Sequence, residues 1–121
     1  QERGGSIVNI ASTSGLKGKA SLASYSASKG ALLRLTESLA AEWARYRIRI
    51  NAIAPGAFET SAQSAVLENE DVLKARLRKI PRRRMGLPEE IAPMVAYLLS
   101  PISDFVTGAC FVIDGGEVSK L

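Results

Sequence analysis

The chain has 121 residues, 46% of them hydrophobic, which is the size and composition of one domain with a packed core. Its single cysteine and its lack of histidine exclude an internal disulfide and a histidine-dependent catalytic triad, and they leave a zinc site without its usual ligands. No apolar run approaches the roughly 20 residues that span a bilayer, and the N-terminal residues do not have the pattern of a secretory signal. We therefore expect a cytoplasmic protein without a bound metal and without a membrane partner.

The formal net charge of +4 raises the question of nucleic-acid binding, because clustered cations favour contact with a phosphate backbone. Two basic clusters are present: Arg45, Arg47 and Arg49, and then Lys79, Arg82, Arg83 and Arg84. Aromatic residues make up only 6% of the chain and are not interleaved with these clusters, as a base-stacking surface requires. We expect no nucleic-acid partner. Solvated loops and contact with a phosphate of a substrate carrier or cofactor both remain open.

The first predicted strand covers residues 7–11, IVNIA, an apolar run with the β-branched content of a buried strand. A polar loop, S-T-S-G, follows it. A helix is then predicted from Ser24, a suitable N-cap, with its apolar side formed by Leu32, Leu35, Leu39 and Trp43. Small or apolar residues on the rest of 31–44 suggest that this helix is covered on two sides, by a sheet and by another subunit.

A second strand is predicted over 48–54, IRINAIA, and it stops at Pro55-Gly56. A helix is expected at about 68–79 and another at about 88–99, where Pro88 suits the first turn. A third strand is predicted at 109–113. The alternation of strands and helices predicts an α/β fold with parallel strands and right-handed crossovers.

Three strands form a poor α/β domain by themselves, since a parallel sheet needs both faces covered and its edges protected. The strand at 7–11 has the composition of a central strand, yet it begins only seven residues into a chain that opens Gln-Glu-Arg. The sequence therefore predicts the second half of a larger domain whose first half is missing.

Residues 24–30, SYSASKG, give Lys29 two alternative partners. In the pattern Y-x-x-x-K, Tyr25 and Lys29 share one face of a helix, where the ammonium and the positive helix N-terminus stabilise a phenolate and so favour proton transfer. In the pattern S-x-x-K, Ser26 is a nucleophile and Lys29 its base, which requires companion S-D-N and K-T-G elements. Neither element occurs: Ser103-Asp104 precedes Phe, and Thr107-Gly108 follows Val. The first pattern is favoured.

Five elements in order strengthen that interpretation: NIAS at 9–12, YSASK at 25–29, NAIAPG at 51–56, FET at 58–60, and VTGA with VIDGG within 106–116. Over essentially the whole chain the sequence resembles the short-chain dehydrogenase/reductase family, in the subgroup with a Ser-Tyr-Lys centre that is similar to 3-oxoacyl-carrier-protein reductases. The resemblance implies a Rossmann-type doubly wound parallel sheet. Residues 1–121 would be the C-terminal catalytic half of a single NAD(P)-binding domain, with about three strands and flanking helices.

The resemblance also implies the roles of individual residues. Tyr25 would exchange the proton of an alcohol/ketone pair, Lys29 would support the phenolate and bind the nicotinamide ribose, and Ser12 would position the carbonyl oxygen, with Ser14 a less well spaced competitor. The expected contacts with NAD or NADP come from Tyr25, Lys29, Pro55, Gly56, Phe58 and Thr60. Asn51 and the segment Asp114-Gly115-Gly116 are expected to be structural.

Three family elements are not found: the glycine-rich phosphate turn, the residue at the end of the family's second strand that chooses between a ribose hydroxyl and a 2′-phosphate, and the asparagine of the proton relay. These absences place cofactor binding by the 121 residues alone in question, and they leave a non-catalytic remnant that acts in assembly as the alternative function. The resemblance further implies a homotetramer and a small carbonyl or alcohol substrate. Ala62, Ala65, Val66 and Leu67 in the expected lid at 61–80 hint at an apolar or acyl-like substrate. The first hypothesis is 3-oxoacyl thioester reduction, and dehydrogenation of a sugar, a polyol or another secondary alcohol is the alternative.

Overall fold

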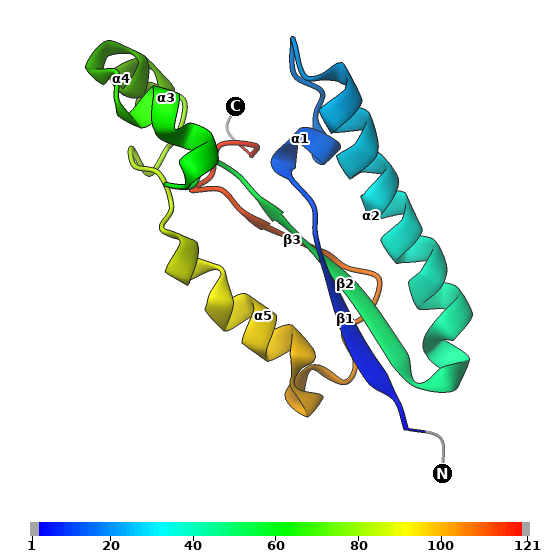
Figure 1. The fold of residues 1–121 in the computed structure, drawn as a ribbon. Coiled ribbons are helices and arrows are strands. Elements are labelled where there is room, and N and C mark those ends of the chain that lie inside the picture. Colours follow the sequence, from blue (N-terminus) through cyan, green and yellow to red (C-terminus); the bar gives the residue numbers. More distant parts are fainter. Residues whose placement is uncertain (1–2, 120–121) are drawn as a thin grey trace.

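The computed structural model describes residues 3–119. Strands β1 (Gly5–Ile10), β2 (Ile48–Pro55) and β3 (Cys110–Ile113) form one parallel sheet in the order β1-β2-β3 (Figure 1). Between them lie the helices α1 (Thr13–Leu16), α2 (Ala23–Trp43), α3 (Ser64–Leu67), α4 (Glu70–Arg78) and α5 (Ala92–Leu99). This architecture confirms the predicted α/β class, and none of the helices within 3–119 is long and apolar enough to cross a membrane.

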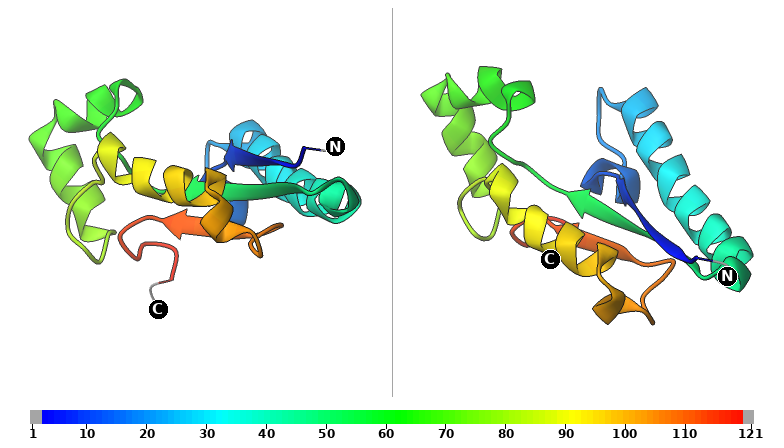
Figure 2. Two further views of the ribbon diagram at one scale, coloured as in Figure 1. Left: turned by 90° about the horizontal axis from the view of Figure 1, so that it is seen from below. Right: turned by 60° about the horizontal axis from the view of Figure 1, so that its bottom comes forward.

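Helices α2 and α5 cover opposite faces of the sheet (Figure 2). The Ser6 hydroxyl of β1 donates a hydrogen bond to the carbonyl of Leu98 in α5 at 2.7 Å. Three residues further along the same strand, the Asn9 amide donates to the hydroxyl of Thr36 in α2 at 3.0 Å. Because side chains three positions apart on a strand point to opposite faces, the two helices lie on different sides of the sheet.

The two crossovers have opposite handedness, which corrects the expectation that both would be right-handed. Both connections move in the same direction across the sheet, from β1 to β2 to β3, but their helices lie on opposite faces. The connection through α2 is right-handed, and the connection through α5 is therefore left-handed. This second crossover is an exception to a strong general rule, and periodicity in the sequence carries no information about it.

Several element boundaries differ from the sequence predictions. The S-T-S-G segment, expected as a loop, begins the short helix α1, which Ser12 caps by accepting a hydrogen bond from the Ser14 N–H. Helix α2 begins at Ala23, which confirms the predicted start near Ser24, but its N-cap position is Leu22, so the assignment of Ser24 as the N-cap is wrong. The region 68–79 contains α4 after an Asn69 cap, and the region 88–99 divides into a 3₁₀ turn and α5.

The fully buried residues of α2 are Leu33, Thr36 and Ala40, and Leu32 of the predicted leucine stripe is partly buried beside them. Leu33 packs with Ala11 and Ala52 of the sheet layer. Leu35, by contrast, is 50% exposed. Two sides of α2 are therefore apolar, as expected, but the side made mainly of small residues faces the sheet, because a close helix–sheet approach favours short side chains.

The expected structural roles of Asn51 and Asp114 are confirmed. The Asn51 amide donates to the Val106 carbonyl at 2.9 Å and accepts from the Ala109 N–H at 3.0 Å, which fixes the segment that enters β3. The Asp114 carboxylate accepts from the N–H groups of Gly116 and Val118 in the turn after β3. Both side chains therefore bond backbone groups that lie just before and just after the short strand β3 and are not paired within it.

The basic clusters do not form one cationic surface. The Arg49 guanidinium donates to the carbonyls of Ser100 and Ser103 and so ties β2 to the end of α5. Arg84 makes an ion pair with Glu90 at 2.7 Å. At least these two arginines serve the fold.

The Arg84–Glu90 pair predicts a pH-dependent contribution to stability. The Arg84 guanidinium and the Leu87 N–H lower the pKa of Glu90 from 4.5 to about 2. Because the folded state holds this carboxylate ionised, its stabilisation is present above pH 4.5 and is lost as the pH falls toward 2. Glu90→Gln should therefore lower the thermal midpoint at neutral pH, and the difference from wild type should shrink toward pH 2. Glu89→Gln is the neighbouring control; equal effects of both variants would contradict the assignment.

Candidate active site

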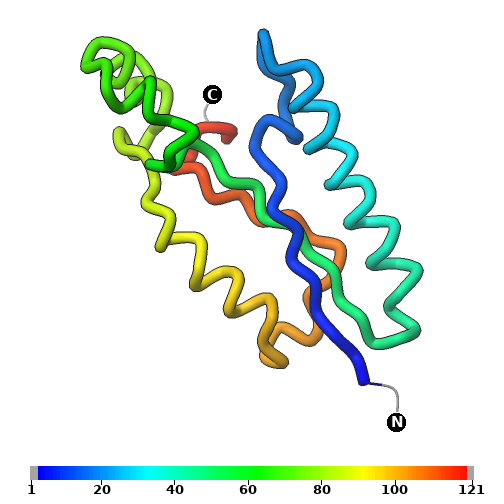
Figure 3. The backbone as a smooth tube through the Cα atoms, viewed as in Figure 1, coloured from blue at the N-terminus to red at the C-terminus, as the bar shows by residue number. Residues whose placement is uncertain are grey.

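The candidate catalytic residues lie at the carboxyl end of the sheet, which is where open α/β sheets bind their ligands. Ser12 follows β1, and Gly56 follows β2. Tyr25 lies in the first turn of α2. The tube in Figure 3 shows α3 and α4 beyond the same end of the strands. The topology thus brings segments from three parts of the chain to one place.

Ser12 is held by its position as the N-cap of α1. Its side chain is buried, with 8% of the residue exposed, and its oxygen accepts a hydrogen bond from the Ser14 N–H at 3.1 Å. The hydroxyl hydrogen is not used in that bond, so Ser12 can still donate to a bound oxygen. Ser14, the competing serine, is also buried, and it supplies this capping N–H.

Tyr25 and Lys29 lie one turn apart on α2. The Lys29 Nζ is 5.8 Å from the centroid of the Tyr25 ring, within the range of a cation–π contact. It also donates to the Ile10 carbonyl at the end of β1, at 2.9 Å. An ammonium has three hydrogens, so two remain for other acceptors. The Tyr25 ring is 45% exposed and is therefore accessible to a ligand.

Gly15 sets the distance between α1 and α2. A Cβ at this position would lie 2.7 Å from the Lys29 carbonyl carbon and 2.9 Å from the Gly30 nitrogen. Contacts that short with backbone atoms would force the two helices apart. Gly15 therefore keeps Ser12 close to the helical turn that carries Tyr25 and Lys29. The sequence analysis did not identify this role, although Gly15 lies only three residues after Ser12.

One cavity of about 420 Å³ brings the candidate residues together, and this volume is in the range of small-molecule sites. Ser12, Ser14, Tyr25 and Gly56 line it. Lys19, Gln63 and Arg76 line it as well, and the sequence reasoning missed these three. No spacing rule could have found Arg76, because its placement depends on how α4 packs against the rest of the chain.

Phe58 and Thr60 lie outside that cavity. Phe58 lines a neighbouring cavity of about 250 Å³, and its ring packs on Gly86, where a Cβ would lie 2.5 Å from the ring. Thr60 is exposed, and its side chain caps no helix. The structure therefore separates the two residues from the group around Tyr25.

The turn after β2 needs glycine for a reason that the sequence does not reveal. A Cβ on Gly56 would lie 2.7 Å from the Asp114 Cβ, so the turn after β2 and the turn after β3 could not approach each other. Pro55, the last residue of β2, is paired with Ile113. Within residues 3–119, no group of three or more His, Cys, Asp or Glu side chains could hold a metal ion.

A family profile described as enoyl-(acyl carrier protein) reductase matches residues 1–117. The chain belongs to the short-chain dehydrogenase/reductase family. Among curated proteins, it is 39% identical over 120 residues to the 2-dehydro-3-deoxy-D-gluconate 5-dehydrogenase of Dickeya dadantii, covering 99% of this chain and 47% of that protein. It is 44% identical over 118 residues to the acetoacetyl-CoA reductase of a Synechocystis strain, covering 97% and 48%. This short-chain dehydrogenase/reductase chain thus spans about half the length of the relatives it matches.

Solved structures agree with this membership. The gluconate 5-dehydrogenase of Burkholderia cenocepacia, in complex with NADP and tartrate, superposes with a TM-score of 0.91 at 35% identity, covering 96% of this chain and 46% of that one. A 4-hydroxyisoleucine dehydrogenase complexed with NADH gives a TM-score of 0.93 at 38% identity, covering 96% and 48%. The described elements therefore have the arrangement found in one half of a short-chain dehydrogenase/reductase, which confirms the predicted Rossmann-type half.

Proposed function

We propose that the protein carrying this chain is an NAD(P)-dependent oxidoreductase that interconverts a carbonyl and a secondary alcohol at Ser12, Tyr25 and Lys29. The observation that carries the proposal is the cavity that Ser12 and Tyr25 share, with the Lys29 ammonium 5.8 Å from the tyrosine ring. Family membership supports the reaction class. Residues 1–121 would form the C-terminal catalytic half of a single domain.

In this proposal the three side chains handle the substrate oxygen and its proton. Ser12 donates a hydrogen bond to that oxygen. During oxidation Tyr25 accepts the hydroxyl proton as the C=O bond forms, and during reduction it returns the proton. Lys29 stabilises the phenolate with its charge. A nicotinamide dinucleotide held beside Tyr25 and Lys29 would supply the hydride-transfer chemistry for the substrate carbon.

The residues present fit the nicotinamide end of such a cofactor. Phe58 is buried, yet neither its N–H nor its C=O makes a hydrogen bond with any residue in 3–119. Backbone N–H and C=O groups form hydrogen bonds readily, so this pair is available to a planar amide ligand. Gly56, two residues before Phe58, lines the cavity of Tyr25, and Lys29 retains hydrogens for ribose hydroxyls. Pro55 and Thr60 are proposed cofactor contacts by resemblance to the family. The relatives solved with NADP and NADH support NAD or NADP as the cofactor.

The substrate and the assembly are further parts of the proposal. The acetoacetyl-CoA reductase relative supports 3-oxoacyl thioester reduction, whereas the gluconate-type relatives support a polyhydroxy acid. The half-exposed Leu35 side of α2 and the exposed Val112 of β3 are apolar surfaces that a homotetramer would cover. A cytoplasmic location without a nucleic-acid partner completes the proposal.

A substrate-panel assay of the complete protein tests it. Reduction of 3-oxoacyl thioesters and oxidation of secondary alcohols would be followed by the absorbance of the nicotinamide, with NAD(H) and with NADP(H). Turnover of at least one substrate pair is expected. A protein that binds neither cofactor and turns over no substrate would support the non-catalytic assembly role instead.

A further inference from the structure

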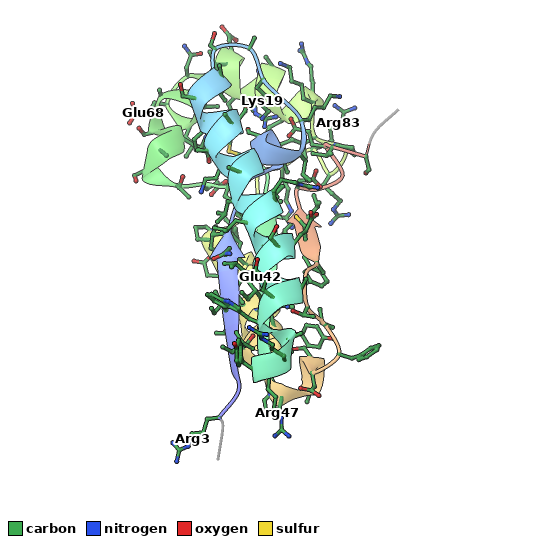
Figure 4. All side chains as sticks on the ribbon, turned by 90° about the vertical axis from the view of Figure 1, so that its right-hand side faces the viewer. Arg3, Lys19, Glu42, Arg47, Glu68 and Arg83 are labelled. Atoms are coloured by element: carbon green, nitrogen blue, oxygen red, sulfur yellow. The ribbon has the colours of Figure 1, made fainter. Side chains whose placement is uncertain are left out.

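The charge of the cavity wall points to a substrate class. Lys19, from the loop between α1 and α2, and Arg76, from α4, line the cavity that holds Ser12 and Tyr25. No Asp or Glu among residues 3–119 lines it. Figure 4 shows Lys19 at the end of the molecule where α3 and α4 lie. A concave site with cations on its wall and no anion favours a negatively charged ligand.

Most apolar residues of the lid do not line this cavity, so they do not support the acyl-chain hypothesis. Val66 and Leu67 of α3, together with Leu73 and Leu77 of α4, pack against the buried cluster of Ala57, Ile80 and Met85. Ala65 does not line the cavity either. Of the four lid residues that suggested an acyl-like substrate, only Ala62 lines it. The lid thus uses its apolar side to hold α3 and α4 in place, and it presents Gln63 and Arg76 to the cavity.

Arg76 is held in position by an acidic residue outside the cavity wall. Its Nη1 donates to both oxygens of Glu117 at 2.9 Å, and the two side chains are only 19% and 16% exposed. Nε and Nη2 of Arg76 bond no residue in 3–119, so one edge of the guanidinium remains open to a second carboxylate. Lys19 forms no ion pair within the same residues and contributes a full positive charge. The wall therefore stays positive despite Glu117.

We propose that this cavity selects a hydroxy or oxo acid, a small molecule with a carboxylate beside the reacting carbon, and that Lys19 and Arg76 bind that carboxylate. The inference rests on the proposed function, because Tyr25 and Ser12 define which carbon reacts. Lys19 and Arg76 would bind the carboxylate, and Ser12 and Tyr25 would bind the hydroxyl or carbonyl oxygen. A coenzyme A thioester is also anionic, but its phosphates are remote from the reacting carbon.

Matched substrates test the proposal in the complete protein. Each 2- or 3-hydroxy acid and oxo acid would be assayed beside its primary amide and its coenzyme A thioester. Wild type should prefer the acid in kcat/KM. Lys19→Gln and Arg76→Gln should each lower kcat/KM for the acid about tenfold or more, mainly by raising KM, and leave the amide nearly unchanged. Lys17→Gln and Arg78→Gln are the control variants, since neither side chain lines this cavity.

Three results would overturn the assignment: equal use of acid and amide by wild type, equal loss for both in the variants, or preference for the thioester. If Arg76→Gln alone does not fold, the double variant Arg76→Gln/Glu117→Gln replaces it. This variant removes both charges of the ion pair, so Glu117 is not left as an unpaired carboxylate. If no substrate is turned over, the proposed function fails, and calorimetric titration with succinate against succinamide tests the anion site independently. Succinate binding that is lost in Lys19→Gln supports the site; absence of binding to wild type overturns it.

Discussion

Tyr25→Phe is expected to lower turnover of the complete protein by about 10²–10⁴-fold while leaving affinity for the nicotinamide cofactor nearly unchanged. The substitution removes one oxygen from an exposed ring that lies in the first turn of α2 and lines the cavity with Ser12. Packing around the ring hardly changes, so the loss reports proton transfer rather than folding. Steady-state kinetics and cofactor fluorescence titration measure the two quantities.

Tyr97→Phe is the matched control for this experiment. Tyr97 lies on α5 with a similar exposure, 39% against 45%, and it does not line the cavity. Its replacement should leave turnover at the wild-type level. Full activity of Tyr25→Phe, or the same loss in both variants, would remove Tyr25 from the proton transfer.

The local part of the site could be predicted from the sequence because it depends on helix geometry. Residues four apart on a helix share a face, so the sequence alone places Lys29 beside Tyr25. The loop after β1 could be assigned to the ligand-binding end of the sheet for a similar reason. The proposed roles of Ser12, Tyr25 and Lys29 rest on two short motifs; in the structure Ser12 and Tyr25 line one cavity, and the Lys29 Nζ is 5.8 Å from the centroid of the Tyr25 ring.

The rest of the site depends on contacts between distant segments, and the sequence carried little sign of them. Arg76 faces the cavity because Glu117, 41 residues later, holds its guanidinium. The apolar side chains of Val66 and Leu67 suggested an apolar substrate pocket, yet they pack against the buried cluster that contains Ile80 and Met85. Hydrophobicity predicts that a side chain is buried but not what buries it, so substrate chemistry was the weakest of the sequence predictions.

The same limit explains the errors in the fold. The spacing of leucines on α2 predicts an apolar side but not which side meets the sheet, where the fully buried residues are Leu33, Thr36 and Ala40. Thr36 is buried because Asn9 of β1 donates to its hydroxyl. A polar residue with a buried partner on another element cannot be distinguished, by periodicity, from one that faces water.

Asn51→Ala is expected to have the largest effect on stability, a loss of about 3 kcal/mol in the free energy of unfolding. Asn51 is fully buried, with 0% exposed, in the middle of β2. Its amide bonds the Val106 carbonyl and the Ala109 N–H, so the substitution leaves two backbone groups without partners and also creates a cavity. Urea denaturation of the complete protein, followed by circular dichroism, measures the change.

Asn69→Ala provides the comparison that separates this role from the general cost of removing an asparagine. Asn69 is exposed and caps α4 by accepting from the Val72 N–H at 3.1 Å, so its replacement should cost about 1 kcal/mol. If Asn51→Ala lowers the free energy of unfolding no more than Asn69→Ala does, then the two hydrogen bonds of the Asn51 side chain are not needed to hold β3. A larger loss in Asn51→Ala would show that the Asn51 hydrogen bonds hold β3 in place. They would then also support the site, because the turn after β3 places Asp114 against Gly56, which lines the cavity.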